Sequence, residues 1–89
     1  MSERLTADII VQGRMPTPSE YKASISLLKE VASAGEHGLS AWRAASLNET
    51  ETRAWIANAQ AGLTRNRPDR PWEVVVLTEL GKLYLSQRS

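Results

Sequence analysis

Three arginines lie within the six residues 65–70, and this spacing predicts a cationic loop. Arg65, Arg67 and Arg70 lie beside Pro68 and Pro71, which interrupt regular structure. Guanidinium groups neutralise phosphates and enter narrow minor grooves, so this loop could hold a double-stranded DNA backbone. The alternative is an ordinary solvated loop whose charge serves solubility.

A second group of polar side chains lies on a helix expected at residues 50–61. Arg53 could donate twice to guanine, and Asn58 or Gln60 could pair with adenine, if they face outward. Glu49 and Glu51 stand at the start of this helix. They would repel phosphates there, or they simply cap the helix and oppose its dipole.

Three tryptophans are prominent in a chain that has two tyrosines and no phenylalanine. Packing in the core is the default expectation for Trp42 and Trp55, and Trp72 is expected to pin a hairpin to the body. The alternative places Trp55 partly exposed beside Arg53, as an anchor for a protein partner.

Catalytic and metal-binding patterns are missing from the sequence. The chain has no cysteine, which excludes disulfides and thiolate chemistry, and its single histidine, His37, is expected in an exposed loop. Glu49 and Glu51 are two residues apart, so they do not converge on one substrate. We therefore expect no enzymatic activity, no metal and no cofactor.

Charge and hydropathy narrow the class of protein further. The formal net charge is +1, but residues 53–89 carry six basic and three acidic side chains. No apolar run approaches the roughly 20 residues of a membrane helix, and no secretory segment is apparent. A soluble, cytoplasmic protein with a basic C-terminal part is expected.

Two capped helices form the predicted core. Thr17, Pro18 and Glu20 make a capping box before a helix at 18–34. Its apolar stripe comprises Tyr21, Ile25, Leu27, Leu28, Val31 and Ala32. Asn48 and Glu51 repeat this capping pattern before the helix at 50–61, whose predicted core stripe comprises Thr52, Ile56, Ala59 and Leu63.

Shorter elements fill the rest of the chain. Ser40 can cap a short alanine-rich helix at 41–47. Extended segments at 63–65 and 72–77 flank the arginine loop and predict a hairpin. Thr78 can cap a last helix, with Leu80, Leu83 and Tyr84 expected on its buried face.

The first sixteen residues are predicted to be a strand or an arm, separate from a domain at 17–89. Residues 7–12 contain three consecutive β-branched residues and lie before Gly13 and Pro16. Ile9, Ile10 and Val11 are consecutive apolar residues, which suggests a strand buried on both faces. Such a strand could pair with the hairpin sheet or with a second copy of the chain, giving a homodimer.

The order of these elements, in an α+β fold, resembles a winged helix-turn-helix: three helices, a hairpin wing and a C-terminal helix behind an N-terminal arm. The segment from Gly62-Leu63 through the arginine loop, Val74 to Thr78, Gly81 and Leu85 is similar to the wing of MarR-type regulators. No element expected from this sequence corresponds to the long terminal helices through which those proteins dimerise. The resemblance implies that the helix at 50–61 enters the DNA major groove and that the wing reaches the adjacent backbone.

Two functions therefore remain open. The first is a DNA-binding transcription regulator that uses Arg53, Asn58, Gln60 and the three loop arginines. The second is a small winged-helix interaction module, of a phage or plasmid type, which binds a host protein through the helix at 50–61, with Trp55 and Arg53 as contacts. Near-neutral charge and the acidic start of that helix favour the second.

Overall fold

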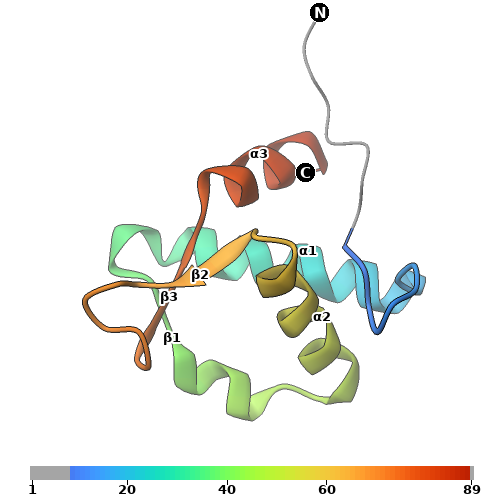
Figure 1. The fold of residues 1–89 in the computed structure, drawn as a ribbon, viewed down its shortest axis with the longest axis horizontal. Coiled ribbons are helices and arrows are strands. Elements are labelled where there is room, and N and C mark those ends of the chain that lie inside the picture. Colours follow the sequence, from blue (N-terminus) through green and yellow to red (C-terminus); the bar gives the residue numbers. More distant parts are fainter. Residues whose placement is uncertain (1–8, 89) are drawn as a thin grey trace, which may run out of the picture.

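The computed structural model describes residues 9–88, in which helices pack on one small antiparallel sheet (Figure 1). The elements in chain order are α1 (Pro18–Ser33), the 3-10 turn η1 (Gly35–His37), β1 (Leu39–Ser40), the 3-10 helix η2 (Ala41–Ser46), α2 (Glu49–Gln60), β2 (Thr64–Asn66), β3 (Val74–Leu77) and α3 (Glu79–Arg88). The predicted α+β class is confirmed, and each expected helix and strand beyond residue 17 lies within two residues of its predicted position.

The helix caps form as the sequence predicts. The Thr17 hydroxyl accepts from the Glu20 amide at 3.2 Å, and the Glu20 carboxylate accepts from the Thr17 amide at 2.8 Å. Asn48 and Glu51 make the same reciprocal pair at the start of α2. These bonds satisfy amides that have no partner inside a helix, so they fix where α1 and α2 begin.

The sheet has the order β1-β3-β2, so β3 lies in the middle (Figure 1). Thr64, Arg65 and Asn66 lie opposite Leu77, Val76 and Val75, which confirms the predicted hairpin. The two-residue strand β1 pairs with the other edge of β3 and was not expected. A two-residue strand is too short to show a period in the sequence.

Two glycines permit close approaches around this sheet. At Gly38, which has a φ of 81°, a Cβ would lie 2.1 Å from the Val74 side chain. At Gly81 on α3, a Cβ would lie 2.0 Å from the carbonyl oxygen of Leu63. Neither position accommodates a side chain, so these glycines set how closely β1 and α3 approach the hairpin.

One apolar cluster joins the helices to both ends of the described chain. Its buried members are Ile9, Val11, Leu28, Ala57, Leu63 and Tyr84. Leu27 and Val31 are also buried on α1, which confirms most of the predicted stripe, although Ala32 is exposed. The helices therefore pack on a centre to which residues near the start and the end of the chain both contribute.

The predicted core stripes of α2 and α3 are wrong in part. On α2 the buried residues are Ala54, Ala57 and Asn58, whereas Ile56 is 50% exposed. On α3 Tyr84 is buried as expected, but Leu80 and Leu83 are each more than 40% exposed. Small residues let α2 approach α1 closely, so the larger apolar side chains of α2 remain outside.

The N-terminal segment is a tight turn rather than a continuous strand. Val11 and Arg14 exchange backbone hydrogen bonds around Gln12, which has a φ of 52°. Ile9 and Val11 are buried, but Ile10 is 50% exposed, so burial on both faces was the wrong expectation. The segment packs on the chain's own core; no described residue of it pairs with the sheet, and residues 7 and 8 of the predicted strand lie outside the described range.

Candidate interaction surfaces

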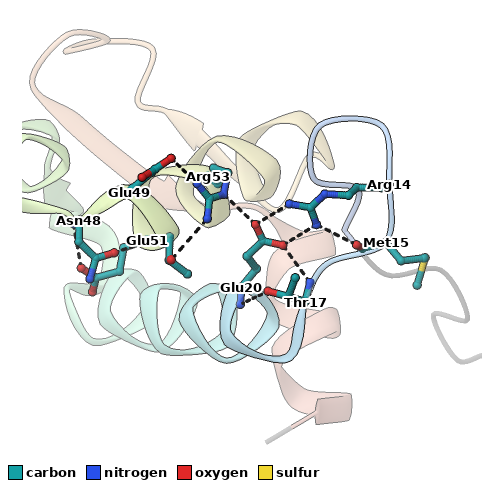
Figure 2. Close-up of polar contacts among 9 residues, drawn as sticks. Arg14, Met15, Thr17, Glu20, Asn48, Glu49, Glu51 and Arg53 are labelled. Carbon is teal, nitrogen blue, oxygen red and sulfur yellow. Dashed lines mark hydrogen bonds and ion pairs between the residues drawn. The ribbon is translucent and has the colours of Figure 1, made fainter.

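A buried carboxylate ties the N-terminal turn to both long helices (Figure 2). The side chain of Glu20 is 1% exposed and receives both Nη atoms of Arg14, at 2.7 and 2.9 Å. The Nε atom of Arg53 on α2 reaches the same carboxylate at 2.7 Å. Oε1 accepts from Arg14 and the Thr17 amide, and Oε2 accepts from Arg14 and Arg53, so each carboxylate oxygen has two donors.

These donors control the ionisation of Glu20. Hydrogen bonds from Arg14, then from the Thr17 amide and then from Arg53, hold the pKa of Glu20 far below its usual range. Burial opposes this shift but is the smaller influence. Glu20 therefore stays ionised and acts as a structural clamp.

The clamp uses the arginine that was expected to read DNA bases. Arg53 also pairs through Nη1 with Glu49 at 2.9 Å and through Nη2 with Thr50 at 3.4 Å. Its side chain is 25% exposed. With all three nitrogens engaged inside the protein, the expectation of a free guanidinium at position 53 is wrong.

Asn58 is also placed differently from its prediction. It is 2% exposed, and its Oδ1 accepts from the Ser24 hydroxyl at 2.5 Å, while its Nδ2 donates to the Ser24 carbonyl at 3.3 Å. A buried amide needs such partners, and here they cross from α2 to α1. The expected outward orientation is wrong, and the side chain cannot reach a base.

The outer face of α2 is consequently apolar and acidic. Gln60 is exposed as predicted, but its neighbours on the surface include Ile56 and Ala59. The side chain of Glu49 at the start of α2 is 89% exposed. The twelve residues of α2, all of which the structure describes, include one cation, Arg53, which is paired, so this face carries no unpaired cation.

The hairpin does present its arginines, but two of them are paired. Arg67 contacts Asp69 at 2.8 Å, and Arg70 contacts Glu73 at 2.9 Å. Arg65 is exposed and makes no ion pair with any described residue. The loop is therefore less cationic than its sequence suggests, with one guanidinium left unpaired.

The largest exposed apolar side chains are two tryptophans. Trp42 is 78% exposed and Trp72 is 80% exposed, so the predictions that one packs in the core and the other pins the hairpin are wrong. Trp55 is partly buried. An indole buries about 150–250 Å² when it is covered, so two open indoles leave a substantial apolar area in contact with water.

Both exposed tryptophans lie at the same end of the sheet. Ser40 pairs with Val74, and the amide of Ala41 donates to the Glu73 carbonyl at 2.8 Å. Trp42 and Trp72 each lie one residue beyond this last bond, where β1 leads into η2 and the hairpin tip returns to β3 (Figure 1). We call this end of the sheet, with its two indoles, the tryptophan edge.

The charged residues nearest to the tryptophan edge in sequence are neutralised internally. Arg43, next to Trp42, contacts Glu30 at 2.7 Å. Glu73, next to Trp72, contacts Arg70. The edge therefore offers apolar area without a net charge that would select a polyanion.

A metal site and a membrane-spanning helix each have requirements that residues 9–88 do not meet. Within this range no three histidine, aspartate or glutamate side chains gather as metal ligands, and none of the helices has both the length and the apolar character needed to cross a membrane. His37 is exposed in η1. The sequence matches no protein-family model and no curated protein, and the fold matches no solved structure.

Proposed function

We propose that the protein is a small interaction module with a winged-helix arrangement, which binds another protein through its tryptophan edge. The observation that carries this proposal is the exposure of Trp42 and Trp72 at one end of the sheet. Trp is enriched among the residues that contribute most binding energy at protein interfaces. Contiguous apolar area on a soluble domain commonly marks such an interface.

The element order supports the winged-helix part of the proposal. A helix, a short helix, a second long helix and a hairpin follow one another, and β1 completes a three-stranded sheet. That arrangement is compatible with a winged helix. The α2 surface supports a protein partner over DNA, because Arg53 is paired, Asn58 is buried and Glu49 is exposed.

The partner-binding residues differ from those that the sequence suggested. Trp55 and Arg53 were the expected contacts, but Trp55 is partly buried and Arg53 belongs to the Glu20 clamp. Trp42 and Trp72 replace them because each of these side chains is about four-fifths exposed.

The test is differential capture from cells that encode the protein. Wild type, the double variant Trp42→Ser/Trp72→Ser and the control Ile56→Ser are immobilised, and retained proteins are quantified by mass spectrometry. We expect one protein that wild type and the control retain and the tryptophan variant loses. The purified partner should then bind wild type directly, with a blue shift of tryptophan fluorescence. Equal retention by all three chains contradicts the proposal.

DNA binding is the second candidate, and the unpaired Arg65 on the hairpin favours it. Arg70 is 61% exposed and could exchange Glu73 for a phosphate. A gel-shift titration with random duplex at low salt tests this candidate. No shift at about 50 μM protein contradicts it, because non-specific DNA binders have Kd values of about 1–100 μM.

If DNA does bind, the hairpin arginines should account for its salt dependence. Replacing Arg65, Arg67 and Arg70 together with alanine is expected to reduce the slope of log K against log salt by up to about three. An unchanged slope excludes the hairpin as the contact. The predicted homodimer stays a separate prediction, although Ile9 and Val11 pack within their own chain; a monomer mass in sedimentation at high concentration would remove it.

A further inference from the structure

A cavity of about 760 Å³ lies between the end of α1, the hairpin and the first turn of α3. Its volume falls in the range of about 300–1,000 Å³ that is typical of small-molecule sites. Apolar side chains form part of its lining, among them Val31, Ala32, Val76 and Leu77. Neither Trp42 nor Trp72 nor any residue of α2 contributes to it, so this site is independent of the proposed function.

Some of the charged side chains that line the cavity form ion pairs with one another, and two do not. Arg67 is paired with Asp69 at 2.8 Å, and Lys82 is paired with Glu79 at 3.1 Å. Two further charged residues, Arg65 and Glu36, line the cavity without an ion pair to any described residue. One positive and one negative charge therefore remain available to a ligand.

Both of these charged residues lie near Arg67. Arg65 lies opposite Val76 in the hairpin, and Arg67 follows two residues later along the same edge. Nη1 of Arg67 donates to the carbonyl oxygen of Glu36 at 3.4 Å. Arg67 therefore connects the two residues: it contacts Glu36 and lies two residues beyond Arg65 in the hairpin.

We propose that this cavity binds a short free peptide with apolar side chains, whose carboxylate pairs with Arg65 and whose ammonium group pairs with Glu36. An extended dipeptide or tripeptide spans at most about 7–11 Å, a length that a cavity of about 760 Å³ accommodates. Its side chains would cover the apolar lining, and a single amino acid would leave most of the volume unfilled. A ligand with only one charge would leave Arg65 or Glu36 without a counter-ion.

The experiment uses three forms of one peptide and four forms of the protein. Leucyl-valyl-leucine, its N-acetyl form and its C-terminal amide are titrated into ¹⁵N-labelled wild type, Glu36→Gln, Arg65→Gln and the control Lys29→Gln. Backbone amide shifts give both the site and the affinity. Lys29 is an exposed α1 residue outside the cavity, so its loss changes the net charge without changing the site.

The expected pattern assigns each peptide end to one side chain. The free peptide shifts the amides of Ala32, Val76 and Lys82, and acetylation weakens its binding to wild type about threefold to fivefold, the range of an exposed ion pair. Acetylation has no further effect in Glu36→Gln, and amidation has none in Arg65→Gln. The Lys29→Gln control behaves as wild type does.

Three results overturn the proposal. The first is no saturable shift at about 10 mM peptide, a concentration that detects even very weak ligands. The second is a set of shifted amides outside the cavity, and the third is equal affinity for the free, acetylated and amidated peptides. Glu36 and Arg65 are exposed, so both variants should keep the wild-type spectrum away from the substituted residue.

Discussion

At the scale of single residues, Glu20 has two roles: it caps α1, and it joins segments that are distant in the sequence. Its position in the capping box follows from the sequence alone. Its contacts with Arg14 and Arg53 come from segments 6 and 33 residues away and cannot be inferred from local spacing. Those contacts tie three segments of the chain together and engage the Arg53 guanidinium within the protein.

The pKa of Glu20 leads to a prediction on acid stability. A carboxyl group whose pKa is lowered on folding stabilises the folded state fully above its ordinary value of about 4.3, and loses that contribution as the pH falls towards the folded value. Glu20→Gln should therefore unfold at a lower temperature than wild type at pH 7, by roughly 10 °C. The difference should shrink steadily between about pH 5 and pH 2. Thermal unfolding followed by circular dichroism measures both, and a constant difference across that range contradicts the role given to Glu20.

The exposed tryptophans give a second prediction at this scale. Trp42→Ser and Trp72→Ser each remove an indole that is about four-fifths exposed, so the free energy of unfolding should change by no more than about 0.5 kcal/mol. Urea titration monitored by far-UV circular dichroism measures this change. A loss of about 2 kcal/mol or more would mean that the indoles pack on their own chain, and the proposed interface would lose its basis.

At the scale of elements, the sequence predicts boundaries better than it predicts faces. Caps, prolines and glycines act locally, so the positions of α1, α2, the hairpin and α3 follow from them. The buried face of α2 depends on how closely α1 approaches, and that distance is set by Ala54, Ala57 and the Ser24–Asn58 bond. Because these packing partners lie far away in sequence, the apolar residue Ile56 was assigned to the wrong face.

The contact between α3 and the hairpin yields a third prediction. A methyl group at position 81 would overlap the Leu63 carbonyl, so Gly81→Ala should destabilise the fold by about 2–3 kcal/mol. Gly62 is the matched control. It has a positive φ of 77°, but a Cβ there would meet only the end of Leu80 at 3.9 Å, so alanine should cost about 1 kcal/mol. Equal losses in chemical denaturation would show that α3 can shift to make room.

At the scale of the whole molecule, the candidate site is the part that sequence reasoning predicted least well. The arginine loop was located correctly, but its ion pairs with Asp69 and Glu73 reduce its charge. The tryptophan edge exists only because the unexpected strand β1 pairs with β3 and brings residues 42 and 72 to one end of the sheet. That pairing joins segments more than thirty residues apart and leaves no periodic signal in the sequence.

The core cluster makes a fourth prediction that concerns the whole fold. Ile9 is fully buried in the same cluster as Tyr84, so the N-terminal segment is part of the folded body. Ile9→Ala should lower the free energy of unfolding by about 2–4 kcal/mol, whereas Ile10→Ala should change it by less than about 1 kcal/mol. Urea denaturation of the two variants measures the contrast. Similar losses of stability for both variants would contradict the burial of Ile9 in the core with Ile10 left exposed.

The way in which Ile9 and Val11 complete the core also has a kinetic consequence. The cluster that they join is complete only with Tyr84, about 75 residues further along the chain, and closing so long a loop is entropically unfavourable until the helices are already assembled. The N-terminal segment should therefore dock late during folding and be the first to undock from the native state. Its amide protons would then exchange with deuterium earlier than those of α1 and α2, as a local opening that leaves the rest of the molecule closed.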